Sequence, residues 1–435
     1  MSSYQNLVGQ PCDVRVIGDP VGREYRPPMP DRDVAATFLR WTCIRAVFSR
    51  GYWLVTSLYL VVEADLNAFQ LVFIGTAQGI TALAFEVPTG VMADTISRKW
   101  SIVIAHVLTG TGMLATGLVT DFPALVMTQM LWGLGWTFTS GAEVAWLTDE
   151  LDRPDRVAGV LTASARWQQV GAAIGMVGFG ALAWATDLAT SIVTSGLAML
   201  MLGLFVVARF TEHRFTPTRE RRWRESMSIF RRGFALARRD HEILLVFAAT
   251  LLVNGAAEGF GRLFPKRLVE LGFPEKPDPI VWFTALGLVT LAVGALALRI
   301  VEARIDGVGG ARRLYAAACF IGALGLIVLA HAPDDATGMA GVLLVAGIAW
   351  PVTRCVSVIW VNRRTTSDVR ATVQSFLAQA EYLGEISLGI TLGILAQATS
   401  ITIAMMGSCV LAACAGVLVA RSRAGRAPSV EMADG

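Results

Sequence analysis

Apolar segments about 20 residues long recur along most of this chain, and they constrain its fold more than any other feature. A helix of about 20 apolar residues spans the hydrocarbon core of a bilayer. A window of that length finds twelve such segments, at 38–62, 68–93, 100–120, 124–147, 157–184, 188–210, 242–263, 280–301, 312–331, 338–361, 371–395 and 400–420. Only 16% of the residues are charged, against about 25% in soluble domains, and the mean hydropathy is +0.55. The sequence therefore predicts an all-α membrane protein with twelve transmembrane helices.

The twelve segments divide six and six around one long polar connection. We predict an N-terminal tail, a six-helix bundle, a linker, a second six-helix bundle and a C-terminal tail, at 1–36, 37–210, 211–241, 242–421 and 422–435. Three residue pairs, each separated by 214 residues, relate the two halves: Trp146 and Trp360, Arg156 and Arg370, Gly175 and Gly389. Such spacing is expected of a duplicated unit whose copies are related by an axis along the membrane normal. The two bundles should therefore be pseudo-symmetric.

The linker carries apolar residues at steps of three and four, from Trp223 to Ala237, with arginines on the other faces. This pattern predicts a basic amphipathic helix lying along the inner leaflet. A solvated linker helix is an equally good interpretation.

The distribution of lysine and arginine indicates the orientation. If the N-terminus is cytoplasmic, the inside loops contain most of these residues, and the short outside loops contain none except Lys266, Arg267 and Lys276. Positive charge on the cytoplasmic side is the rule for membrane proteins. The first 35 residues are polar and proline-rich, without the apolar run of a secretory signal. We expect a multi-pass protein of the cell (inner or plasma) membrane with both termini in the cytoplasm.

Several function classes lack support. The six cysteines are scattered and no Cys/His spacing typical of a metal site occurs, so neither disulfides nor a metal centre is predicted. No nucleophile–base pair or phosphate-binding loop is present, so we do not expect an enzyme. The net charge of +3 is small and dispersed, which gives no indication of nucleic-acid binding. We expect a monomer without a cofactor, with the bilayer as its environment.

One motif concentrates charge between the second and third apolar segments. Gly90, Asp94, Arg98 and Lys99 are spaced as Gly-x-x-x-Asp-x-x-x-Arg-Lys, and Asp149 follows the fourth segment as a partner for the cations. This spacing resembles the loop signature of the major facilitator superfamily, although Thr95 and Ser97 stand where Arg and Gly are common. The resemblance implies a latch between the two halves on the cytoplasmic side. The alternative is cytoplasmic charge without a gating role.

Two further stretches resemble the drug–proton antiporter branch of that superfamily, which includes tetracycline- and macrolide-efflux-like proteins. They are Phe-Glu-Val-Pro-Thr-Gly at 85–90 and Ser-Gly-Ala-Glu-Val-Ala-Trp-Leu-Thr-Asp-Glu at 140–150. The resemblance implies efflux of drugs and multidrug resistance. Gln129 occupies the position where related antiporters carry an intramembrane arginine.

Charged residues within the apolar segments are the candidates for mechanism, because each is costly in a membrane unless it is paired or hydrated. Four of them lie in the inner half of the first bundle and should form one internal network: Arg45, Glu86, Glu143 and Arg166. The network has either a structural role or contact with substrate or protons.

The second bundle contains Glu381 and Glu385, which lie one helical turn apart on one face. Two carboxylates this close do not ionise together readily, and such a group suits proton coupling. Glu258, followed one turn later by Arg262, is a further candidate. The alternative for each acid is a permanent ion pair with Arg354 or Arg262.

Aromatic and basic side chains near the membrane centre are candidates for a substrate cavity. Aromatic rings can stack on a flat organic substrate, although Trp and Tyr also anchor proteins at the membrane interface. The candidates are Trp53, Trp132, Trp136 and Tyr382, with Arg50, Arg262 and Arg354. Arg50 and Arg262 could hold an anion.

These observations favour a proton-driven exporter of amphiphilic organic compounds that works by alternating access, with the proton gradient as its energy source. Uptake of a specific small metabolite by symport is the first alternative. A lipid flippase or a membrane sensor on the same scaffold is the second.

Overall fold

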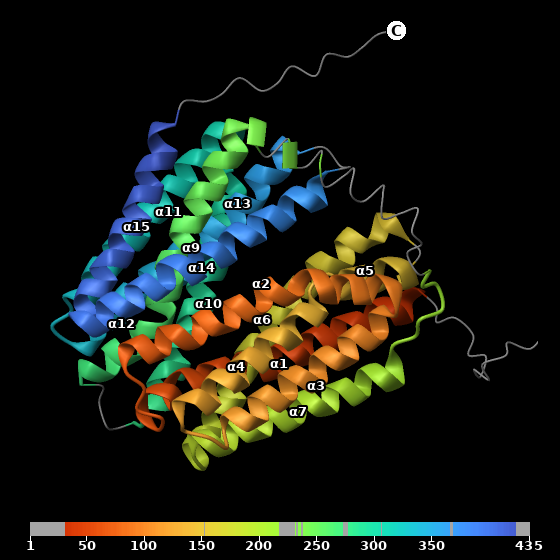
Figure 1. Cartoon of the computed structure of the whole chain (residues 1–435), viewed down its shortest axis with the longest axis horizontal. Helices are drawn as coiled ribbons and strands as arrows, with labels where there is room; N and C mark the ends of the chain where they lie inside the picture. The colour runs from red at the N-terminus through yellow and green to blue at the C-terminus, as the bar shows by residue number, and fades with distance from the viewer. Residues whose placement is uncertain are drawn as a thin grey trace, which may run out of the picture.

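The computed structural model describes residues 31–151, 153–216, 231, 234–235, 238–272, 277–305, 307–365 and 369–422, and all regular elements within them are helical (Figure 1). The first helices are α1 (Asp31–Val62), α2 (Ala68–Thr95), α3 (Arg98–Thr116), α4 (Phe122–Thr139), α5 (Ala142–Leu151), α6 (Pro154–Ala185) and α7 (Leu188–Arg209). The later ones are α9 (His241–Glu270), α10 (Pro279–Arg304), α11 (Gly307–Ala330), α12 (Asp335–Val342), η1 (Leu343–Ala349), α13 (Trp350–Arg364), α14 (Arg370–Ala398) and α15 (Ile401–Arg421). Most of the predicted linker helix lies outside the described residues.

The helices form two groups, α1–α7 and α9–α15. Within the first group, α1 packs on α6 and α3 on α7, and within the second, α9 packs on α14 and α11 on α15. Helices α2 and α6 contact α14 and α10 across the boundary. The groups converge near α12 and the start of α2, and they diverge toward α5 and α13 (Figure 1). We call these the closed end and the open end.

Two predicted helices are interrupted. The segment predicted at 124–147 is divided into α4 and α5 at Gly141, whose φ of +78° is a conformation that residues with a Cβ rarely adopt. The segment predicted at 338–361 contains a π-helical stretch, η1, just before Pro351. Proline has no N–H to donate to the preceding turn, which accounts for irregular hydrogen bonding there.

Seven of the described helices are long and apolar enough to cross a membrane by length and composition: α2, α7, α9, α10, α11, the continuous rod α12–α13, and α15. Helices α1, α3, α4, α6 and α14 are not among them. The predicted number of twelve spans therefore remains a prediction.

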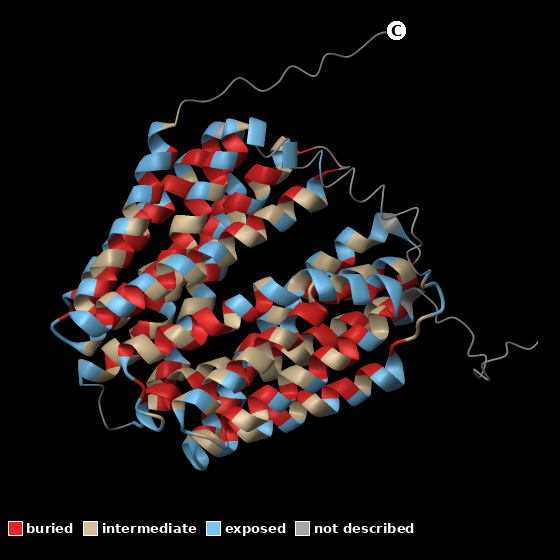
Figure 2. Ribbon diagram, in the orientation of Figure 1, coloured by how far each residue is buried: buried red, intermediate tan, exposed pale blue. Residues whose placement is uncertain are grey.

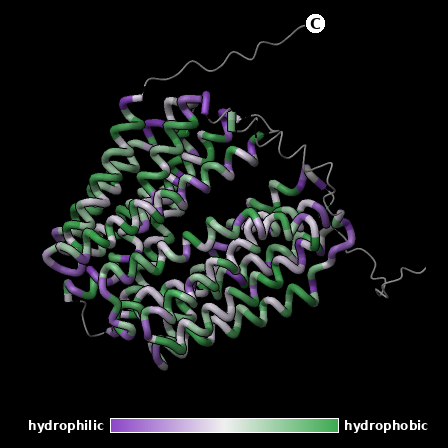
Figure 3. The backbone as a smooth tube through the Cα atoms, in the orientation of Figure 1, coloured by the Kyte–Doolittle hydropathy of each residue, from purple (hydrophilic) through white to green (hydrophobic). Residues whose placement is uncertain are grey.

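The outer faces of the helices are apolar. On α7, Leu197, Met201 and Leu204 are 50%, 63% and 59% exposed. Exposed residues on the outside of the bundles coincide largely with apolar ones, whereas polar residues gather at the helix ends and between the groups (Figures 2 and 3). An apolar surface of this kind is stable only when lipid covers it.

The residues separated by 214 positions occupy corresponding places in the two groups. Trp146 on α5 and Trp360 on α13 are both fully buried. Gly175 on α6 packs against the carbonyl of Val47 on α1, and Gly389 on α14 packs against Glu258 on α9. The contact of α1 with α6 in the first group therefore corresponds to the contact of α9 with α14 in the second.

Gly175→Leu should destabilise the protein, because even a Cβ at this position would collide with the Val47 carbonyl of α1. Overpacking of this kind costs about 1–3 kcal/mol, which a melting curve in detergent would detect. Gly178→Leu on the same helix is the matched control, since no atom lies within 4 Å of a Cβ there. Equal melting temperatures for the two variants would contradict the close α1–α6 contact.

A charged cavity between the two helix groups as the candidate functional site

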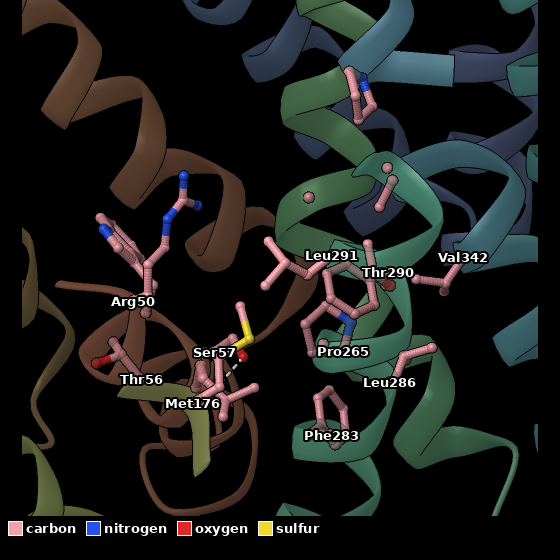
Figure 4. A pocket seen from close by; sticks show the side chains of 18 of the residues that line it. Arg50, Thr56, Ser57, Met176, Pro265, Phe283, Leu286, Thr290, Leu291 and Val342 are labelled. Atoms are coloured by element: carbon pink, nitrogen blue, oxygen red, sulfur yellow. Dashed lines mark hydrogen bonds between the residues drawn. The ribbon is translucent and has the colours of Figure 1, made fainter. Parts of the chain in front are cut away.

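A cavity of about 570 Å³ lies between the two groups. Arg50 of α1 and Met176 of α6 line one wall, and Phe283 and Thr290 of α10 line the opposite wall (Figure 4). Trp53 of α1 also lines this cavity. A second cavity of about 400 Å³ shares Arg50, Trp53 and Gln169 and extends among α1, α3, α4 and α6. Organic ligands typically occupy pockets of about 300–1,000 Å³ with few polar groups, and the larger cavity has this size.

Glu258 and Arg262 form an ion pair at the boundary between the groups. The Arg262 Nε lies 2.8 Å from Glu258 Oε1, and its Nη2 donates to Gln78 Oε1 of α2 at 3.0 Å. Gly75 leaves room for both side chains, since a Cβ there would collide with them, and Gly389 lies against Glu258 from α14. The two charges therefore neutralise each other, and the neighbouring glycines leave the space that both side chains need.

Glu381 and Glu385 of α14 are placed differently from Glu258. Both are half-buried, and neither side chain forms a hydrogen bond or an ion pair within the described part of the chain. Arg354 of α13 acts electrostatically on both, and Glu258, Glu381 and Arg262 act on Glu385. The structure thus gathers the three acids predicted for proton coupling in one region but directly pairs only Glu258.

Two arginines in this region also lack direct partners. Arg50 of α1 and Arg354 of α13 are exposed, and they act electrostatically on each other across the boundary. Considering only described residues, neither guanidinium donates a hydrogen bond or forms an ion pair. Of the three arginines predicted for the substrate cavity, Arg262 is therefore the one whose guanidinium already has an ion-pair partner, Glu258.

Three tryptophans form a continuous aromatic wall. The rings of Trp53 and Trp132 meet edge to face at a centroid distance of 5.0 Å, and those of Trp132 and Trp136 stack at 6.0 Å. Trp136 is 44% exposed, and Tyr382 of α14 is half-buried. Trp53 thus lines both cavities and Trp132 and Trp136 line the second one, whereas Tyr382 is not among the residues that line either cavity.

Gln129 has a role that the sequence did not indicate. It is fully buried, and its Nε2 donates to the Tyr52 hydroxyl at 2.8 Å and to Thr116 Oγ1 at 3.0 Å. These bonds join α4 to α1 and α3 through neutral groups. This position of α4 therefore holds a structural polar contact.

The four residues predicted as one internal network are not joined. Arg45 and Glu143 form an ion pair of 2.7 Å. Glu86 instead accepts a hydrogen bond of 3.1 Å from Gln379 of α14, and Arg166 is exposed, without an ion pair to a described residue. The physical reason is helix rotation, which turns Glu86 toward the other group and Arg166 away from its neighbours.

The predicted hinge cluster is assembled at the open end. Arg98 forms an ion pair with Asp149, donates to the Ala145 carbonyl at 2.8 Å and lies 3.6 Å from Asp94. Lys99 donates to the Val207 carbonyl at 2.9 Å. No atom lies within 4 Å of a Cβ built on Gly90, so this face of α2 is uncovered in the structure.

Glu212 is a member of the cluster that sequence analysis missed. Its carboxylate accepts hydrogen bonds from the Ser97 hydroxyl at 2.5 Å and from the backbone N–H groups of Arg98 and Lys99 at 2.7 and 3.1 Å. A carboxylate at a helix N-terminus is favourable because it satisfies free N–H groups. The position of Glu212, just after α7, gave no signal of this in the sequence.

Lys266, an exception to the predicted charge distribution, connects the groups at the closed end. Helix α9 continues to Glu270 rather than ending near residue 263, and Lys266 Nζ donates to the Leu66 carbonyl beyond α1 at 2.9 Å. The neighbouring Arg267 donates to the Ala330 carbonyl of its own group at 3.1 Å. Both cations are thus held by carbonyl groups at helix ends.

Lys266→Met should loosen the closed end, because it removes a hydrogen bond from a cation between the groups. We expect a cysteine introduced at Thr290 in the cavity wall to react roughly tenfold faster in the Lys266→Met variant than with Lys266 present. The reagent is a membrane-impermeant maleimide added on the side of the membrane that the closed end faces. The background should contain no other cysteine. Arg267→Met is the control, since its bonds stay within one group, and an unchanged rate in Lys266→Met would contradict the contact.

Comparisons with known proteins agree with this architecture. The family model of the Major Facilitator Superfamily matches residues 42–388. The chain is 20% identical to the uncharacterized MFS-type transporter YxaM of Bacillus subtilis (strain 168), over 83% of this chain and 89% of that protein. The fold is similar to the crystal structure of the nucleoside transporter NupG, with a TM-score of 0.72, 14% identity, and coverage of 90% and 100%.

It is also similar to a bacterial homologue of the human lysosomal transporter Spinster in an inward-facing and unoccupied conformation, with a TM-score of 0.66, 13% identity, and coverage of 91% and 96%. At these identities the solved structures establish the fold alone. The family model covers most of the chain, including the hinge cluster and the cavity residues. The chain therefore belongs to the major facilitator superfamily and is a membrane transporter of that type.

Proposed function

We propose that this chain is a proton-coupled secondary transporter that moves amphiphilic organic compounds across the cell membrane by alternating access. Residues 37–210 and 242–421 would form the two moving bundles, with twelve spans and both termini in the cytoplasm. The open end would then face the cytoplasm, and the hinge cluster of Asp94, Arg98 and Asp149 would meet the second bundle when that end closes.

The observation that carries this proposal is the pair of acids without direct partners, Glu381 and Glu385, on a helix that contacts both groups. An ionisable group inside a membrane protein is costly and typically marks a proton or substrate path. Glu258 contributes less in this conformation, because Arg262 neutralises it. We assign the proton to Glu381 and Glu385, and the aromatic part of the substrate to the wall formed by Trp53, Trp132 and Trp136.

The first possible mode of coupling is antiport, in which the substrate is exported while a proton enters. In antiport, substrate and proton compete, so a neutral or cationic amphiphile leaves when Glu381 or Glu385 is protonated. The resemblance of residues 85–90 and 140–150 to drug–proton antiporters supports this form.

Uptake of a specific metabolite by symport is the second form. Arg50 and Arg354, which have no direct partner, support it because a guanidinium binds an acidic group well. NupG, which is similar in fold, is a nucleoside transporter.

The test is transport by the purified full chain in liposomes, with a panel of dyes and drugs and an imposed pH gradient. We expect accumulation that a protonophore abolishes. Transport that continues unchanged without the gradient would refute proton coupling. Movement of labelled lipids alone would indicate a flippase, and movement of nothing would indicate a sensor.

A further inference from the structure

Arg50 and Arg354 carry charges that no ion pair or hydrogen bond of their guanidinium groups compensates within the described residues. They come from opposite groups, α1 and α13, and each repels the other across the boundary. Arg50 lines both cavities, and Pro351, one turn before Arg354, lines the larger one. The third arginine, Arg262, is held by Glu258 and Gln78.

Like charges facing each other inside a membrane protein are unfavourable unless something negative lies near both. Glu381 and Glu385 supply that charge beside Arg354 when they are ionised, since Arg354 acts on both. When these two acids are protonated, Arg50 and Arg354 are left as two uncompensated cations beside a cavity. Guanidinium groups bind carboxylate, sulfonate and phosphate groups through paired hydrogen bonds.

We propose that Arg50 and Arg354 together recognise an acidic group on the substrate, and that the substrate is an aromatic or amphiphilic organic anion. This inference rests on the proposed transport function and specifies its substrate class. Trp53 follows Arg50 by three residues on α1, so an aromatic ring attached to the acidic group would reach the wall of Trp53, Trp132 and Trp136. Because Arg50 belongs to the first group and Arg354 to the second, an anion bound by both would connect the two groups.

The arrangement also determines the sign of coupling. Ionised Glu381 and Glu385 compete with an anion for Arg354, so protonation of these acids and binding of the anion favour each other. The groups that face them are Glu258 and Arg262 of α9, Arg354 of α13, Tyr315 of α11, and Glu86 of α2 through Tyr382. Proton and anion would therefore move together, which is symport.

The experiment compares fluorescein with rhodamine 6G, which share a planar xanthene ring system and carry opposite charges. The purified full chain is placed in liposomes, and flux of each dye is measured under pH gradients of both directions. We expect fluorescein to move with protons about tenfold faster than rhodamine 6G. Arg50→Gln and Arg354→Gln should each lower fluorescein flux about tenfold, with partial recovery in Arg50→Lys and Arg354→Lys.

Arg313→Gln is the matched control, because Arg313 lies near the start of α11 at the open end and is exposed, with a hydrogen bond to the Gly309 carbonyl of its own helix. Melting curves check that each variant is folded. If a Gln variant does not fold, the corresponding Lys variant, which keeps the positive charge, is compared with the wild type instead. Fluorescein flux at the wild-type rate in both Gln variants would overturn the inference. Proton-driven export of rhodamine 6G without fluorescein flux would overturn it while leaving the proposed transport function intact. Absence of flux for both dyes would overturn both proposals.

Discussion

Replacing Arg262 with Gln should destabilise the protein by about 3–5 kcal/mol, because it leaves the Glu258 carboxylate without its counter-charge inside the helix packing. The two side chains are only 17% and 16% exposed, and the ion pair of 2.8 Å is enclosed by Gly75 and Gly389. The same substitution removes the hydrogen bond to Gln78 that joins the two groups. Thermal unfolding of the purified protein in detergent would measure the loss.

The double variant Glu258→Gln with Arg262→Gln is the decisive companion to this variant. It removes both charges and keeps both side-chain volumes, so it should recover most of the lost stability. The interaction between the two substitutions in a double-mutant cycle separates the ion pair from the packing. A double variant no more stable than Arg262→Gln alone would show that the charge of Glu258 is not what makes the single variant unstable.

Glu385→Gln should reduce proton-driven transport to the level of liposomes without protein. The amide has nearly the shape of the carboxyl group but cannot take up or release a proton near neutral pH. Glu381→Gln should have the same effect if the two acids share the proton. Exchange of substrate at equal pH on both sides should persist in these variants, because the cavity walls are unchanged.

Glu270→Gln is the control for this second prediction. Glu270 is also an acid of the second group, but it lies at the end of α9 at the closed end, 3.9 Å from Arg267 and away from the central region. Its substitution should leave proton-driven transport intact. A double Glu381→Gln, Glu385→Gln variant that still accumulates substrate against a gradient would refute the assignment of the proton to these residues.

Much of the helix arrangement could be predicted from local composition. Ten of the predicted segments correspond to single helices, because a run of apolar residues in lipid must satisfy its backbone hydrogen bonds within itself. The limits of α9 were less predictable: Lys266 and Arg267 end the apolar run, yet the helix continues to Glu270, and carbonyl groups of other segments accept hydrogen bonds from both side chains. The division at Gly141 was also missed, since glycine is compatible with a helix and with a break.

The candidate site was predictable in its members and less so in its pairs. Arg98 and Asp149 meet as the positions of their charges indicated, and Glu258 meets Arg262 one turn away on the same helix. By contrast, Glu86 was expected to join Arg45 and Glu143 but bonds to Gln379, which is 293 residues away in sequence. Neutral residues such as Gln78 and Gly75 gave no signal, because only their place between the groups gives them a role.

The sequence by itself determined that this chain is helical, that it belongs in lipid, and which ionisable residues interrupt its apolar segments. These properties are local, since hydrophobicity and charge act on each segment wherever it packs. Only the tertiary structure decided which charges neutralise each other and which are left to face the cavity. Pairing depends on helix rotation and on separations of a few ångströms between distant segments, and the contacts that bring Glu86 to Gln379 and leave Arg50 opposite Arg354 exist only once the two groups are packed together.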